Sequence, residues 1–227
     1  MSSRGSQLGA LGKPLTRFHP EALTRVQQRI LAVSGEPTSR WGAYLAGGTA
    51  LALYFGHRRS DDFDWFTPDT IPPAALLADV ETLGFAIDVH QNTEGTFLGL
   101  VGGVKFSVFR YRYDLLTPTI RLDGCQLASL RDLAAMKLAA LCGRATKKDY
   151  VDVHALMSLG RMPLSAMASA FAMKYPTGDP IAAVRAVGYF EDTEKQTMPA
   201  MLNKTTWKNV KDRLSRSVVT FDWSSLR

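Results

Sequence analysis

The sequence is poor in cysteine and lacks any long apolar run. Its 227 residues include two cysteines, Cys125 and Cys142, and neither lies in a C-x-x-C pair. This argues against a disulfide framework and against a cysteine-based zinc site. The longest unbroken apolar run, residues 50–55, contains six residues, whereas a membrane-spanning helix needs about 20. We therefore expect no segment that crosses a membrane.

Composition and charge are those of a folded protein with an excess of basic residues. The N-terminal segment contains no apolar stretch of about 7 to 15 residues, which a secretory signal requires, so we expect a cytoplasmic location. Apolar residues make up 46% of the chain and charged residues 21%, which argues against wholesale disorder. The 27 basic and 21 acidic residues give a net charge of +6. Such an excess favours polyanionic partners, including nucleotides and RNA.

The pattern of residues divides the chain into three parts. Residues 1–20 are rich in Gly, Ser and Pro and are expected to form a partly ordered arm. Residues 21–128 carry strand and helix signals, and residues 129–227 have the Ala-, Leu- and Met-rich texture of helices. We therefore predict an α+β fold, in which a core with a sheet is followed by a helical C-terminal region.

Local patterns predict the elements of the core. Apolar spacing predicts a helix that begins at Glu21 and is closed by Gly35 and Pro37. Acidic and aromatic residues alternate with a period of two at 62–65, which predicts a strand. The other expected elements are a strand at 44–46, helices at 50–55 and 74–83, and an antiparallel meander of strands at 85–90, 96–101 and 105–112.

Two carboxylates share one face of the predicted acidic strand. Asp62 and Asp64 are two residues apart, so they lie about 6.6 Å apart along the backbone at about 3.3 Å per residue, and both can reach one cation. Phe63 and Trp65 then face the core. A solvated edge strand whose acids face water is the alternative. The crowding of acidic residues favours a compensating cation, because like charges repel.

A glycine pair precedes these carboxylates. Gly47, Gly48 and Thr49 lie between a predicted strand and a predicted helix. Glycine lets the backbone approach a ligand closely, and a helix N-terminus offers free N–H groups to an anion. An ordinary strand-to-helix turn also favours glycine. The combination of a phosphate cradle with two carboxylates is the layout needed for phosphoryl or nucleotidyl transfer, since Mg²⁺ takes ligands from carboxylates and substrate phosphates.

The segment from Leu45 to Phe66, LAGGTALALYFGHRRSDDFDWF, resembles the signature of the AbiEii/AbiGii toxin family of nucleotidyltransferases. That family belongs to the DNA polymerase β-like superfamily, whose motif is Gly-Gly or Gly-Ser, a spacer of roughly ten residues and an Asp-x-Asp pair. Here 13 residues separate Gly48 from Asp62. The resemblance covers about residues 44–156, and it implies a nucleotidyltransferase fold with a mixed or antiparallel sheet.

A second block carries the same resemblance. Ser129 is a good N-cap for a helix in which Lys137 interrupts the apolar stripe. A lysine there is costly unless its amine snorkels to solvent or meets an anion, and a nucleotide phosphate or Asp149 would serve. The block is similar to the family's helical lysine and its later Lys-Asp-x-x-Asp segment, which here is Lys148–Asp152.

The resemblance implies a site for an NTP and Mg²⁺, with Mn²⁺ as an alternative ion. Asp62 and Asp64 would hold the metal, and Lys137 and Asp149 would complete the catalytic set. The residues expected to contact the nucleotide are Gly47, Gly48, Thr49, Arg58 and Ser60. On a continuing strand, the Ser60 hydroxyl would share the acidic face.

Ser107 is a departure from the wider superfamily, which usually has a third carboxylate on a later central strand. Either Asp149 substitutes for that carboxylate, or a second metal ion is weakly held. The resemblance implies the toxin of a toxin–antitoxin or phage-defence pair that moves a nucleotidyl group from an NTP to RNA, with a tRNA 3′ end as one acceptor and an antitoxin protein as partner. The alternatives are a nucleotide-binding module without turnover and a transferase to a small-molecule or protein hydroxyl.

Overall fold

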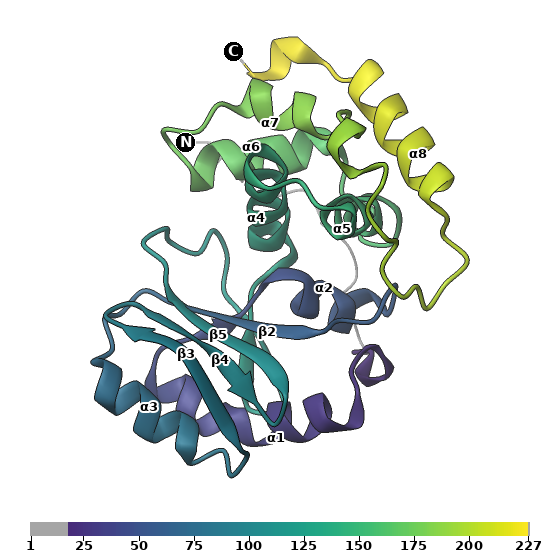
Figure 1. Cartoon of the computed structure of the whole chain (residues 1–227). Coiled ribbons are helices and arrows are strands. Elements are labelled where there is room, and N and C mark those ends of the chain that lie inside the picture. Colours follow the sequence, from purple (N-terminus) through teal and green to yellow (C-terminus); the bar gives the residue numbers. More distant parts are fainter. Residues whose placement is uncertain (1–17, 227) are drawn as a thin grey trace, which may run out of the picture.

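The computed structural model describes residues 18–226. Most of the predicted N-terminal arm, residues 1–17, lies outside the described residues. Figure 1 shows a sheet with helices on both faces, followed by a helical half that sits against one end of the sheet. The predicted α+β class is therefore confirmed. Among the described residues, no helix is both long enough and apolar enough to cross a bilayer.

The sheet of the described chain has seven strands in the order β3-β4-β5-β2-β1-β7-β6. Its strands are β1 (Tyr44–Leu45), β2 (Asp62–Thr67), β3 (Ile87–Thr93), β4 (Thr96–Val101), β5 (Val104–Arg110), β6 (Ile120–Leu122) and β7 (Cys125–Leu127). The predicted meander is confirmed, because β3, β4 and β5 pair antiparallel in sequence. Strand β5 pairs parallel with β2, which makes the sheet mixed.

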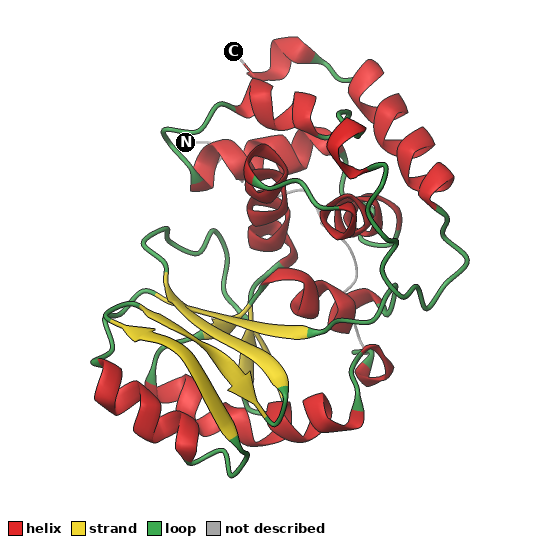
Figure 2. Ribbon diagram, in the orientation of Figure 1, coloured by secondary structure: helices red, strands yellow, loops and turns green. Residues whose placement is uncertain are grey.

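Helices cover both faces of the sheet and then form the second half of the chain (Figure 2). They are α1 (Arg25–Arg40), α2 (Gly47–Phe55), α3 (Pro73–Glu81), α4 (Leu130–Gly143), α5 (Lys147–Ser158), α6 (Leu164–Lys174), α7 (Pro180–Ala186) and α8 (Trp207–Val219), with short 3₁₀ turns at Pro20–Ala22, Glu191–Thr193 and Trp223–Leu226. Helices α1 and α3 lie on one face of the sheet, and α2 and α4 lie towards the other.

The predicted limits of the first helix are wrong at both ends. Helix α1 begins at Arg25, because Thr24 caps it in a capping box with Gln27. It also runs through Gly35 and Pro37 to Arg40. A Cβ on Gly35 would lie 3.1 to 3.2 Å from the backbone of the β6–β7 turn, so close packing against this turn requires glycine and keeps the helix intact beyond its local stop signals.

The core forms where alternate residues of β2 face inward. Phe63 and Trp65 are fully buried, and their rings pack at a tilt against Phe106 of β5. Asp62, Asp64 and Phe66, which alternate with these two residues on β2, are only half-buried. The predicted alternation is confirmed, and it leaves one face of β2 free to carry polar side chains.

Candidate active site

Asp62 and Asp64 project from the same face of β2, as their spacing predicts. Both are half-buried. Burial raises the pKa of the Asp64 carboxyl above its ordinary value, and the neighbouring Asp62 charge raises it further. The parallel pairing of β2 with β5 sets Ser107 directly opposite Asp64. The position at which the resemblance predicts a third carboxylate is thus adjacent to the acidic pair and carries a hydroxyl.

The glycine pair starts helix α2 beside these carboxylates. Gly47 has φ +65°, a left-handed backbone conformation that residues with a side chain rarely adopt. A Cβ there would also lie 3.0 Å from Asp64 Oδ2. The first N–H groups of a helix have no intrahelical partner. In α2 no side chain caps them either, because Ala46 stands at the N-cap position. The predicted helix at residues 50–55 therefore starts three residues early, and its open N-terminus lies next to Asp64.

Two predicted nucleotide ligands, Thr49 and Ser60, are buried, and the Thr49 hydroxyl lies 3.4 Å from Asp62 Oδ1. The Thr49 and Ser60 side chains hydrogen-bond each other at 2.7 Å, and the Thr49 hydroxyl also donates to the Asp62 carbonyl. Strand β2 begins only at Asp62, so the expectation that Ser60 continues its acidic face is wrong. Gln27 fixes this turn by donating to the Ser60 carbonyl at 2.8 Å. Both hydroxyls hold the start of β2 against α2, and their direct contact with a nucleotide remains a prediction.

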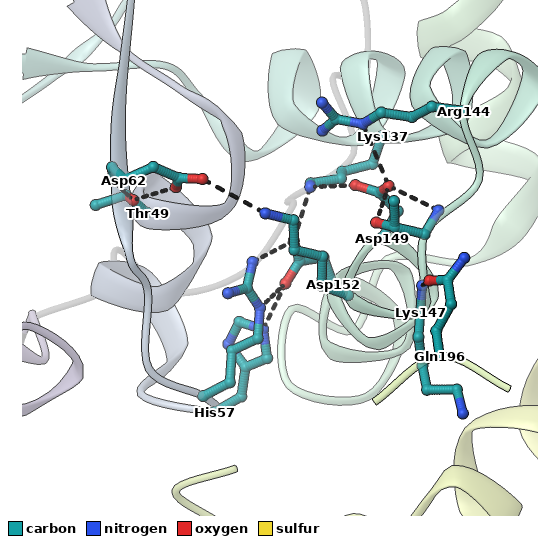
Figure 3. A network of polar contacts seen from close by, with 12 residues as sticks. Thr49, His57, Asp62, Lys137, Arg144, Lys147, Asp149, Asp152 and Gln196 are labelled. Atoms are coloured by element: carbon teal, nitrogen blue, oxygen red, sulfur yellow. Dashed lines mark hydrogen bonds and ion pairs between the residues drawn. The ribbon is translucent and has the colours of Figure 1, made fainter. Parts of the chain in front are cut away.

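A buried ionic cluster lies behind the carboxylates (Figure 3). Asp152 of α5 accepts from Arg58 Nε at 2.7 Å and Nη2 at 2.8 Å and from His57 Nε2 at 2.8 Å, and it forms an ion pair with Lys137 Nζ at 2.7 Å. Lys137 also donates to Asp149 at 2.8 Å. All five side chains are buried. The turn after α2 is thereby joined to helices α4 and α5.

The cluster is electrically neutral because its carboxyls stay ionised. Burial alone would raise the pKa of Asp152, but Arg58 and Lys137 outweigh it and hold that pKa well below the usual range. The same competition, with Lys137 as the main opposing charge, lowers the pKa of Asp149 to about 2. Burial lowers the pKa of His57, so the imidazole is neutral and its Nε2–H donates to Asp152.

Asp149 is fully buried, and protein donors bond to both of its carboxylate oxygens. Besides Lys137, its carboxylate accepts from the Thr146 amide at 3.1 Å and hydroxyl at 2.5 Å, and Arg144 lies 3.5 Å away. Lys137 bonds to Oδ1, the other contacts all lie at Oδ2, and the Asp149 side chain is 0% exposed. Of the two alternatives for the missing third carboxylate, the structure therefore disfavours substitution by Asp149.

Sequence reasoning missed Asp152 as a site residue. It also predicted that Arg58 contacts the nucleotide, which would require an exposed guanidinium. Asp152 follows Asp149 by three residues, so both lie on one face of α5, and that spacing was the available signal. Arg58 is 2% exposed. Its guanidinium occupies the space that a Cβ on Gly48 would need. Arg58 thus supports the glycine turn from behind.

An aromatic pocket of about 570 Å³ opens beside the carboxylates. Helix α4 forms one wall. Its polar lining is Asp64, Lys137 and Arg144, next to Gly47, and its aromatic lining is Phe66, Phe109, Tyr111 and Tyr175. The Tyr111 and Tyr175 hydroxyls hydrogen-bond each other at 2.5 Å. Local sequence patterns gave no signal for these aromatic residues, which come from three separate segments.

Comparison with known proteins identifies the family. Residues 104–225, more than half of the chain, match the family described as nucleotidyl transferase AbiEii toxin, type IV TA system. The protein belongs to this family. It is accordingly a nucleotidyltransferase, and the predicted resemblance is confirmed.

Individual relatives agree with the AbiEii assignment. An uncharacterised protein of Aquifex aeolicus (strain VF5) is 35% identical over 179 residues, which are 77% of this chain and 85% of that protein. The nucleotidyltransferase toxin MenT4 of Mycobacterium tuberculosis H37Rv has a TM-score of 0.56 and 19% identity, over 88% of this chain and 84% of that one. JHP933 of Helicobacter pylori has a TM-score of 0.55 and 15% identity, over 87% and 92% of the two chains. These structures share the fold.

The AbiEii match extends further towards the C-terminus than the predicted resemblance. It begins in β5 and continues through α8, whereas the sequence motifs ended near residue 156. It contains Ser107, Lys137 and the Asp149–Asp152 segment. The Gly-Gly and Asp-x-Asp segments precede the matched residues, so their place in the site rests on the geometry described above.

The AbiEii family implies an NTP substrate and usually a divalent metal ion, and the residues present fit one such ion. Asp62 and Asp64 supply two carboxylates on one face, next to an open helix N-terminus. Within residues 18–226, no group of three or more His, Cys, Asp or Glu side chains is arranged to hold a metal. Mg²⁺ commonly takes one or two carboxylates and completes its shell with water and substrate phosphates, which matches this donor set.

Proposed function

We propose that this nucleotidyltransferase moves a nucleotidyl group from an NTP to RNA, with a tRNA 3′ end as the first acceptor to test, and that it uses Mg²⁺ or Mn²⁺ held by Asp62 and Asp64. One observation carries the proposal. The two carboxylates of β2, the open N-terminus of α2 and the aromatic pocket with its two cations meet at Asp64 and Gly47. A nucleoside triphosphate needs these three environments side by side.

The triphosphate would lie between the α2 N-terminus and the cations. The first N–H groups of α2, at Gly47 and Gly48, would donate to phosphate oxygens, since no side chain competes for them. Lys137 donates to Asp149, forms an ion pair with Asp152 and lines the pocket, so an N–H that is not used on Asp149 would serve a phosphate. Arg144, which also lines the pocket, is 63% exposed and can follow the ligand.

The base would enter the aromatic pocket. Phe66, Phe109 and Tyr111 provide ring faces and edges on one side, and the apolar residues of α4 face them. Stacking of a base on an aromatic side chain contributes about 1 to 3 kcal/mol and tolerates different bases. The pocket therefore accounts for NTP binding without specifying the base.

Positioning and electrostatics would supply most of the rate. The acceptor hydroxyl would lose its proton to solvent and form a bond to the α-phosphorus. The bond from that phosphorus to the oxygen that bridges to the β-phosphate would break, and pyrophosphate would leave with this oxygen. A divalent ion held by Asp62 and Asp64 would neutralise the negative charge that develops on the attacking and leaving oxygens. Lys137 and the α2 N–H groups hold the triphosphate in line, and the buried cluster fixes Lys137 in the orientation that this requires.

RNA is the favoured acceptor because the chain has a net positive charge and belongs to a toxin family. The chain has a net charge of +6, which attracts a polyanion. The AbiEii family is described as the toxin of a type IV system, so we also propose a cognate antitoxin and a role in phage defence. Ser107 favours a binding module without turnover, but membership of an enzyme family weighs against this alternative.

The test is transfer of label from each α-labelled NTP to total RNA in the presence of Mg²⁺. We expect label on RNA with the native chain and none with Asp62→Asn, which keeps the shape of the side chain. Asp88→Asn, at an exposed carboxylate of β3, is the matched control and should label as the native chain does. Label on protein or small molecules would replace RNA as acceptor, and NTP binding without any labelling would favour the binding module.

A further inference from the structure

Lys148 is a cation that pairs with one of the proposed metal ligands, Asp62. It is the second residue of α5, and its Nζ lies 3.4 Å from Asp62 Oδ2. No other Lys or Arg within residues 18–226 forms an ion pair with Asp62 or Asp64. The contact bridges the helical half of the chain to β2. Lys148 is the lysine of the Lys-Asp-x-x-Asp segment, and the catalytic set proposed above assigns it no role.

The bonding of Lys148 differs from that of the neighbouring cations. Arg58 and Lys137 are held by fully buried carboxylates at 2.7 to 2.8 Å. Lys148 has one carboxylate partner at a longer distance, and its side chain is 40% exposed. An exposed pair of this kind contributes little to folding stability. Lysine also has a flexible four-carbon stem, so the ammonium can leave Asp62 while α5 stays in place.

The Lys148 ammonium lies where it would repel a divalent ion that approaches Asp62. Asp62 and Asp64 are the two carboxylates available to a cation, and a positive charge 3.4 Å from Asp62 repels a second one that approaches the same oxygens. A bound NTP changes this balance, because the triphosphate brings more negative charge than one divalent ion neutralises. An ammonium displaced from Asp62 could then bind phosphate oxygens of a triphosphate held beside the carboxylate pair.

We propose that Lys148 is a displaceable cation and a phosphate-binding residue: it neutralises Asp62 in the empty site and moves to the triphosphate when a divalent ion and NTP bind. This rests on the proposed function, because it takes Asp62 as a metal ligand. Lys148 thereby links metal binding to nucleotide binding. The metal alone binds weakly against the lysine, and metal with triphosphate binds tightly with its help.

Two affinities measured on the full chain test this role, and neither depends on turnover. In a titration with Mn²⁺ alone, followed by electron paramagnetic resonance of the free ion, Lys148→Met should tighten binding by about 3- to 10-fold. In calorimetry with inorganic triphosphate and excess Mg²⁺, the same variant should weaken binding by about tenfold, which is the effect of losing one charge-assisted hydrogen bond. Lys148→Arg keeps the charge and should stay within about threefold of the native chain in both titrations.

Matched variants separate this proposal from the proposed function. Lys208→Met removes a lysine that pairs with an aspartate on the surface, 2.5 Å from Asp212, and should change neither affinity. Asp62→Asn should abolish Mn²⁺ binding. If Asp62→Asn does so while Lys148→Met leaves either affinity unchanged, the role of Lys148 is overturned and the metal site stands. If Asp62→Asn leaves Mn²⁺ binding unchanged, the metal site itself is overturned.

Discussion

Replacing Asp152 by asparagine tests whether the buried cluster holds the two halves of the chain together. The native cluster has two cations, Arg58 and Lys137, against two carboxylates, Asp149 and Asp152, with a neutral His57. Asp152→Asn keeps the size of the side chain but leaves one uncompensated positive charge. The side chains of Asp152 and Arg58 are 0% and 3% exposed, so water cannot replace the lost charge.

The expected loss of stability is large. Removing one partner of a buried ion pair costs about 3 to 5 kcal/mol. A chain of this size loses about 2 to 4 °C of Tm per kcal/mol, so Asp152→Asn should lower Tm by roughly 6 to 20 °C at pH 7, as measured by scanning calorimetry. Asp212→Asn removes an exposed carboxylate that pairs with Lys208 and should change Tm by less than about 2 °C.

A double variant tests the reason for this loss. Arg58→Met combined with Asp152→Asn makes the cluster neutral again, because Lys137 and Asp149 remain paired. Its Tm should lie above that of Asp152→Asn alone, although one more contact is gone. A Tm for Asp152→Asn within about 2 °C of the native value would refute the reasoning, and so would a double variant less stable than the single one.

Three further predictions concern acid, glycine and the third carboxylate. Because the pKa of Asp149 is lowered to about 2 from 3.8, its stabilisation of roughly 2 kcal/mol is present above pH 4 and is lost as pH falls towards 2; melting curves of Asp149→Asn should accordingly lose less stability than the native chain between pH 5 and 2, and parallel curves would contradict this. Gly47→Ala and Gly84→Ala both place a side chain at positive φ, but only Gly47 has Asp64 within 3.0 Å of the new Cβ; both should lose about 1 kcal/mol of stability, and only Gly47→Ala should weaken NTP binding in calorimetry. Ser107→Asp restores a carboxylate opposite Asp64 and should raise the Mn²⁺ bound per chain, in the presence of NTP, from about one to about two; the exposed Ser165→Asp is its control, and an unchanged count would show that the backbone position alone does not make a second site.

The sequence predicted the features that depend on local periodicity. Alternation at residues 62–65 fixed both the strand and its acidic face, because a strand has a side-chain period of two. The glycine pair predicted an open helix N-terminus. Lys137 was expected to meet an anion because its helical position faces the core, and its contact with Asp149 is confirmed.

The features that sequence reasoning missed depend on contacts between distant segments. Arg58 and His57 meet Asp152 across 94 and 95 residues, and no local pattern reports such a pairing. Strands β6 and β7 have three residues each, too few for an alternation to be recognised. The extension of α1 through Pro37 follows from close packing of Gly35 against the β6–β7 turn, which overrides local propensity.

The charged side chains around Asp62 and Asp64 fall into two groups, one buried and fixed and the other exposed and free to move. Behind the glycine turn, Asp152 accepts hydrogen bonds from His57 and Arg58 and forms an ion pair with Lys137, and removing any one of these partners leaves buried charge or a buried polar group unpaired. This group cannot respond to a ligand, so it fixes Lys137 and the turn that carries Arg58. In front, Lys148 and Arg144 are 40% and 63% exposed and can move. Substrate binding therefore has to change the exposed cations and leave the buried ones in place, so variants in front should alter ligand affinity with little effect on Tm, whereas variants behind should lower Tm first.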